Sequence, residues 1–253
     1  MTSENTIPES ITNNTDTYQK ISPDFEQQLS DPQQSIVTDY SANSDIMLIA
    51  FGGMNSRMGM PPFEFFRLAQ DYPIKKIFLR DLRQSWYQKG LPQIGGNANA
   101  ILKYLKAEIN QLKPQKIVIT GSSAGGFAAL LFGYLLEVDI VLSFAPQTFI
   151  DTHTCFIVGD NRYRPPIIKL YQYPHGIRKY YNLSKFFQVK HNLKTKFHIY
   201  FDENYLLDKR HAHSLKNHRN VILHPYQEGG HGLIRLLKER GELQQILLDA
   251  LSV

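Results

Sequence analysis

Short apolar runs recur along the chain, and polar or glycine-containing segments separate them. Runs of this length that are rich in β-branched and aromatic residues predict strands buried on both faces of a sheet. The segments between several of them repeat apolar residues at helical spacing, which predicts amphipathic helices. The predicted strands span 45–51, 75–82, 116–120, 139–144, 197–201 and 220–226, and another begins at Ser35. The predicted helices span 63–70, 97–112, 127–137, 209–215 and 233–251, the last interrupted at Gly241.

The stretch 115–134 carries the most informative pattern. A buried strand, 116–120, leads into Gly121-Ser122-Ser123-Ala124-Gly125, and an almost wholly apolar helix follows. This G-x-S-x-G spacing predicts that Ser123 sits on a tight strand-to-helix turn, where small neighbours let strand and helix nearly touch. The alternative is a serine- and glycine-rich loop that matches the pattern by chance. The strand before it and the helix after it favour the exposed, reactive serine.

The GSSAGG turn, its preceding strand and the Gly229-Gly230-His231 segment resemble the α/β-hydrolase superfamily over residues 44–251. The resemblance implies an α/β fold with a mostly parallel sheet flanked by helices. It also implies the chain order serine, acid, histidine for the catalytic groups.

The matching position for the general base is His231, which follows a predicted strand and precedes a helix. The acid belongs in the loop after strand 197–201, which contains three candidates. We favour Asp202, directly at the strand end, with Asp208 the runner-up and Glu203 a distant third. Asp208 has an alternative role, because Asp ahead of a helical run is a preferred N-cap.

The resemblance places an oxyanion hole at the loop after strand 45–51 and at the residue after the serine. The matching backbone N–H groups belong to Gly53 or Met54 and to Ala124. The alternative for Gly52-Gly53 is that the pair only ends a strand.

We expect Trp86, Tyr87 and Gln147 to line a substrate pocket, because they follow the carboxyl ends of predicted strands. The two aromatic residues fit surface packing equally well. Residues 151–192 lack a clear period and are rich in tyrosine and arginine, and by analogy they form a cap. Such a cap suits a polar or sugar-like substrate, and it suits a protein contact as well.

Composition narrows the classes of function. The 253 residues fit one α/β domain, 34–253, preceded by a polar segment, 1–33, that predicts a mobile arm. The net charge of +5 is spread along the chain, so we expect no nucleic-acid partner. The single cysteine, Cys155, excludes an intrachain disulfide and fits a reducing compartment. The N-terminus carries no signal-peptide pattern and no run spans a bilayer, so we expect a cytoplasmic protein without a membrane span.

These features predict a serine hydrolase that cleaves or transfers an acyl group of a carboxylic ester, without metal or cofactor. Segments 86–90, 144–148 and 229–243 resemble, more faintly, hydrolase-fold proteins that accompany polysaccharide and glycoconjugate synthesis. That similarity implies an acylated carbohydrate, so the expected partner is a small-molecule or glycan ester. A thioesterase with the same catalytic residues and a non-catalytic binding protein of this fold remain alternatives. The oligomeric state stays open.

Overall fold

The computed structural model describes residues 23–54, 63–189 and 194–252. Its centre is a seven-stranded sheet with the order β1-β3-β2-β4-β5-β6-β7. β1 pairs antiparallel with β3, and every other neighbouring pair is parallel. The mostly parallel sheet is thereby confirmed. The strands span Ile36–Asp39 (β1), Ile46–Phe51 (β2), Lys75–Leu79 (β3), Lys116–Ser122 (β4), Ile140–Phe144 (β5), Lys196–Asp202 (β6) and Val221–Tyr226 (β7).

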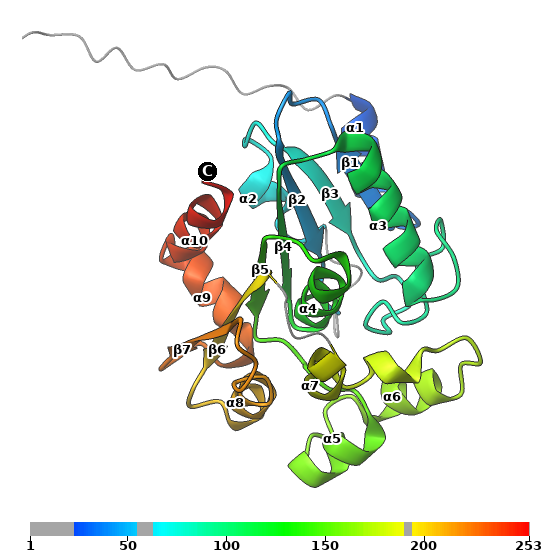
Figure 1. Cartoon of the computed structure of the whole chain (residues 1–253), viewed down its shortest axis with the longest axis vertical. Helices are drawn as coiled ribbons and strands as arrows, with labels where there is room; N and C mark the ends of the chain where they lie inside the picture. Colours follow the sequence, from blue (N-terminus) through cyan, green and yellow to red (C-terminus); the bar gives the residue numbers. More distant parts are fainter. Residues whose placement is uncertain (1–22, 55–62, 190–193, 253) are drawn as a thin grey trace, which may run out of the picture.

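Helices cover both faces of this sheet (Figure 1). α3 and α4 lie on one face, and α2, α9 and α10 lie on the other. α5, α6 and α7 lie together at one end of the molecule. The helices span Pro23–Ser30 (α1), Phe66–Ala69 (α2), Ala98–Leu112 (α3), Ala124–Leu136 (α4), Thr152–Val158 (α5), Arg164–Tyr171 (α6), Leu183–Phe186 (α7), Leu206–His213 (α8), Leu233–Glu239 (α9) and Glu242–Leu251 (α10), with 3₁₀ turns at Arg178–Tyr180, Phe187–Val189 and Gly230–Gly232.

Helices on both faces of the sheet explain why the strands are continuous apolar runs in the sequence. Along β2, Met47, Ile49 and Phe51 enter the core beneath α3 and α4, whereas Leu48 and Ala50 enter the core beneath α2, α9 and α10. Successive side chains of a strand point to opposite faces, so a strand covered on both sides needs apolar residues at every position.

Two chain segments refine the expectations from sequence. Residues 23–30 of the expected mobile arm form α1, and Arg80 donates from its side chain to the carbonyls of Asp31 and Gln34. Of the rest of that arm, 1–22 lies outside the described residues, and 31–33 lies between α1 and β1. The C-terminal helical segment is interrupted as predicted, because α9 ends at Glu239 and Gly241, with φ 74°, precedes α10. In the part of the chain that is described, no helix combines the length and hydrophobicity that a membrane span requires.

Candidate active site

The turn between β4 and α4 holds Ser123 in a backbone conformation that side-chain-bearing residues rarely adopt, with φ 51° and ψ −116°. Close packing makes the neighbouring glycines necessary. A Cβ at Gly121 would lie 2.2 Å from the carbonyl oxygen of Gly125, and one at Gly125 would lie 2.2 Å from that of Phe51. The Ser123 N–H donates to the Phe144 carbonyl at 2.9 Å, which ties the turn to β5. Ser123 therefore stands at the carboxyl edge of the sheet.

His231 meets Ser123 from a loop more than a hundred residues downstream. Its Nε2 lies 2.9 Å from Ser123 Oγ. Its Nδ1 lies 2.8 Å from Asp208 Oδ2 and 3.0 Å from Oδ1. A carboxylate only accepts, so it stabilises the proton on Nδ1 and leaves Nε2 free to accept the serine proton. The two preceding residues, Gly229 and Gly230, have φ of 107° and 55°, values that favour glycine.

Asp208, and not the favoured Asp202, contacts His231. Asp202 Oδ1 accepts the N–H of Asn204 at 2.8 Å, and its Oδ2 accepts the N–H of Gly230 at 2.7 Å. Because Asp202 ends β6, its carboxylate faces these two backbone N–H groups, and its bond to Gly230 holds the segment that carries His231. Asp208 is also not an N-cap, because α8 begins at Leu206 with Tyr205 before it. Glu203 pairs with Lys209 at 2.5 Å instead.

Gln147, expected to line a substrate pocket, lies against Ser123 and is almost fully buried. Its Nε2 lies 3.1 Å from Ser123 Oγ, and its Oε1 accepts the indole N–H of Trp86 at 3.1 Å. Because the indole only donates, this bond fixes which end of the carboxamide faces Ser123. Trp86 and Tyr87 are fully buried rather than lining an open pocket, and the Tyr87 hydroxyl donates to the carbonyls of Gly52 and Leu79.

Of the expected oxyanion-hole amides, that of Gly53 already has a partner. The Gly53 N–H donates to Glu64 Oε2 at 2.8 Å, while Ser122 Oγ donates to Oε1 at 2.6 Å. Burial raises the pKa of Glu64, and these two hydrogen bonds oppose that shift. Ala124 is the first residue of α4, so its N–H has no acceptor within the helix. Of the amides expected there, that of Gly53 is therefore already paired, whereas that of Ala124 has no partner within α4.

A group of charged residues that the sequence did not single out lies behind Asp208. Arg162 Nη1 donates to Asp208 Oδ1 at 3.0 Å, and Arg162 Nη2 donates to Asp160 Oδ2 at 2.8 Å. His211 Nε2 lies 2.9 Å from Asp160 Oδ2. The next residue, Tyr163, hydrogen-bonds Ser123 through its side chain, and burial raises its pKa. The sequence marked this interval as aromatic and basic, but composition does not reveal which members turn inward.

Cys155 is buried among apolar side chains, and burial raises its pKa to about 12. A thiol with so high a pKa is a poor nucleophile near neutral pH. Among the residues that are described, no three His, Cys, Asp or Glu side chains cluster as metal ligands.

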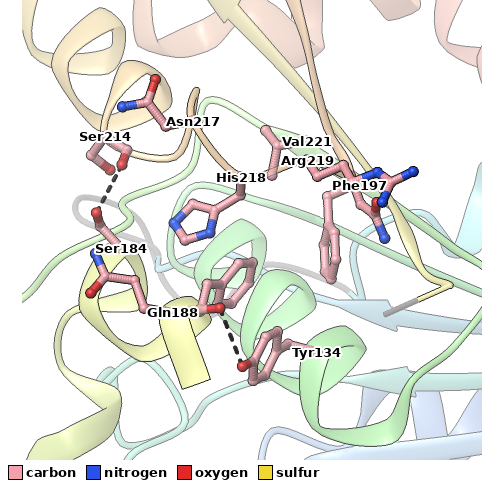
Figure 2. Close-up of a pocket in the computed structure, with 11 residues that line it drawn as sticks. Tyr134, Ser184, Gln188, Phe197, Ser214, Asn217, His218, Arg219 and Val221 are labelled. Carbon is pink, nitrogen blue, oxygen red and sulfur yellow. Dashed lines mark hydrogen bonds between the residues drawn. The ribbon is translucent and has the colours of Figure 1, made fainter. Parts of the chain in front are cut away.

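A separate cavity of about 390 Å³ lies near the amino ends of β6 and β7 (Figure 2). His218 faces into the group of side chains that Figure 2 draws, and its ring packs edge-on against Phe187 at 5.6 Å between centroids. Ser123 stands at the carboxyl ends of the strands, the opposite edge of the sheet. Of the described residues that line this cavity, none is Ser123, His231 or Asp208.

Comparison with solved structures establishes the fold. The capsule O-acetyltransferase of Neisseria meningitidis serogroup A superposes with a TM-score of 0.62 at 16% identity, covering 84% of this chain and 90% of that one. Esterase B from Lactobacillus rhamnosis gives a TM-score of 0.53 at 15% identity, covering 87% and 85%. MPT51 of Mycobacterium tuberculosis gives 0.55 at 11% identity, covering 86% and 93%.

The chain has the α/β-hydrolase fold. No family model matches the sequence, and no curated protein matches it. At such low identities these structures share the α/β-hydrolase fold with this chain. A shared fold does not imply a shared function, so the chemistry of this chain must be argued from its own site.

Proposed function

We propose that this α/β-hydrolase-fold protein is a serine acyl hydrolase or acyltransferase acting on a carboxylic ester. One observation carries the proposal. Ser123 Oγ, His231 and the Asp208 carboxylate form a continuous chain of hydrogen bonds, 2.9 Å and 2.8 Å long, at the carboxyl edge of the sheet. A neutral hydroxyl is a poor nucleophile, and a base held at this distance activates it.

In the proposed reaction Ser123 Oγ attacks the ester carbonyl carbon, and its proton passes to His231 Nε2. Asp208 keeps the ring in the correct tautomer and stabilises the imidazolium. The tetrahedral intermediate then collapses, the bond to the alcohol oxygen breaks, and His231 returns the proton to the departing alcohol. Water or a second alcohol attacks the acyl-serine by the same route, which releases the acyl group and restores the Ser123 hydroxyl.

The negative charge of the intermediate requires donors aimed at the developing oxyanion. We assign this role to the N–H groups of Ala124 and Met54. Ala124 contributes an amide with no partner in its helix, and the positive end of the α4 dipole lies at the same place. The Gly53 amide instead holds Glu64, so its contribution is to fix the loop rather than to bind the oxyanion.

The cap is the proposed source of substrate specificity. Tyr163 and Tyr205 flank the site, and Arg162 lies within 6 Å of both rings. Aromatic and cationic groups of this kind suit a polar, sugar-like alcohol. One solved structure with the same fold is a capsule O-acetyltransferase, which supports an acylated carbohydrate as the substrate class to test first.

A fluorophosphonate probe tests the nucleophile. We expect labelling of the wild-type protein and of two controls, Ser252→Ala and His175→Ala, which alter an exposed serine and an exposed histidine. Ser123→Ala and His231→Ala should lose labelling, and Ser123→Ala should lower turnover by about four decades. Absence of wild-type labelling near neutral pH would favour the non-catalytic binding protein.

A substrate panel then separates the remaining classes of acyl donor. Acetylated sugars, p-nitrophenyl esters of increasing chain length and acyl thioesters are compared by kcat/KM. Adding an acceptor alcohol distinguishes transfer from hydrolysis, because transfer yields a new ester at the expense of free acid. A marked preference for thioesters would move the assignment to a thioesterase with the same catalytic residues.

A further inference from the structure

Arg162, in the cap, forms an ion pair with Asp208, the acid of the proposed site. Asp208 is almost fully buried, and its carboxylate faces two partners, His231 on one side and Arg162 on the other. Arg162 lies between α5 and α6, within residues 151–192, whereas Asp208 lies on α8. The Arg162–Asp208 ion pair therefore joins the cap, residues 151–192, to α8.

Arg162 is itself held in one orientation. Its Nε and Nη2 donate to Asp160 at 3.0 Å and 2.8 Å, which leaves Nη1 aimed at Asp208 Oδ1 at 3.0 Å. Asp160 is anchored in turn by His211 Nε2 at 2.9 Å, and the Thr148 N–H donates to His211 Nδ1 at 3.0 Å. A planar guanidinium fixed at one end presents a defined donor at the other.

We propose that Arg162 is a positioning residue for the proposed reaction, which holds the Asp208 carboxylate against His231 and offsets part of its charge. The inference rests on the proposed function. A carboxylate bonded from both sides cannot rotate away from the imidazole.

Asp208 and His231 lie between groups from several elements. Asp208 contacts the ring from α8, and Arg162 and Asp160 lie behind it in the cap. Tyr205 faces the imidazole with 6.3 Å between ring centroids, and Tyr163 approaches from the cap side beside Ser123. Removal of the Arg162 guanidinium takes a charged donor from Asp208 Oδ1 and leaves the contact with His231 in place.

The test compares Arg162→Gln and Arg162→Lys with Arg164→Gln, a matched control that removes an exposed arginine two residues away. We expect Arg162→Gln to lower kcat by about 10- to 100-fold with little change in KM, because the acid loses its orientation. Arg162→Lys keeps a positively charged donor beside Asp208 and should restore most of kcat, while Arg164→Gln should match the wild type in kcat and in KM.

A second measurement does not depend on turnover. Proton NMR at one fixed pH detects the Nδ1–H proton that His231 donates to Asp208, assigned by its absence in His231→Ala, in folded samples of each variant. This resonance should shift or weaken in Arg162→Gln and stay in place in Arg162→Lys and Arg164→Gln. The same resonance in all variants would overturn the proposal. Loss of the proposed function shows separately, as wild-type protein that a fluorophosphonate does not label while the resonance still responds to Arg162.

Discussion

Asp202 and Asp208 offer a matched pair of buried carboxylates with different expected roles. In Asp208→Asn, Arg162 Nη1 can only donate, so the side-chain oxygen stays at the Oδ1 position that accepts it. The new NH₂ group then faces His231 Nδ1, where Asp208 Oδ2 stood at 2.8 Å. The retained oxygen lies 3.0 Å from the same nitrogen, so the two ends of the amide compete for Nδ1, and the nearer NH₂ favours the tautomer with the ring proton on Nε2. A protonated Nε2 cannot take the proton of Ser123.

We therefore expect Asp208→Asn to lower kcat by about four decades, equivalent to about 5 kcal/mol of transition-state stabilisation. Asp202→Asn should act mainly on stability. Asp202 accepts two backbone N–H groups on separate oxygens, and an asparagine oxygen satisfies one of them. The unpaired buried donor costs about 1–3 kcal/mol of unfolding free energy.

Steady-state hydrolysis of an acetyl ester and urea unfolding of both variants check this assignment. The expected pattern is opposite in the two assays: a large loss of kcat with a small loss of stability for Asp208→Asn, and the reverse for Asp202→Asn. Because Gly230 precedes His231, Asp202→Asn should also slow turnover, by no more than about 100-fold. Asp208→Asn with more than a tenth of wild-type kcat would refute the role of Asp208 in orienting His231.

Two further results follow from buried polar contacts. Trp86→Phe removes the indole donor that orients the Gln147 carboxamide, so it should lower kcat about tenfold. In a Gln147→Met background the same substitution should cause no further loss of kcat. Additive effects of the two substitutions in this double-mutant cycle would contradict the coupling. Burial lowers the pKa of His211, with Asp160 opposing, and the Thr148 N–H also requires an unprotonated Nδ1. The unfolded chain therefore binds a proton below pH 6.5 that the folded protein does not, and stability should fall from pH 7 to pH 5. Urea unfolding should show a smaller fall in His211→Gln, and an identical pH dependence would show that other groups cause it.

Local patterns predicted most of the fold and two of the side chains that the structure brings together, Ser123 and His231. Every predicted strand is present, because strands buried on both faces must be apolar at each position, and this constraint is visible in one short segment. The turn around Ser123 was visible for a similar reason, since contacts as close as that between Gly121 and Gly125 permit only small residues. His231 stood out because it follows a predicted strand and two glycines and precedes a helix, and the structure gives both glycines a positive φ.

The favoured carboxylate, Asp202, does not reach His231, because that contact depends on direction rather than on position along the chain. Asp202 and Asp208 lie six residues apart, one at the end of β6 and the other in the first turn of α8. Only the path of the chain between these two elements decides which carboxylate reaches the imidazole. The expectation for Gly53 was revised for the same kind of reason. Its amide donates to Glu64, eleven residues further along the chain, and no local sequence pattern indicates that contact.

The residues alone determined where the strands and helices form and where a serine is forced out on a tight turn, because those features follow from burial and sterics within a short stretch of chain. Tertiary structure decided which groups surround that serine. Gln147, Arg162, Asp208 and His231 come from separate elements, and long-range packing brings them within hydrogen-bond distance of one another or of Ser123. Hydrogen bonds act over about 3 Å, so only the folded arrangement could reveal these partners.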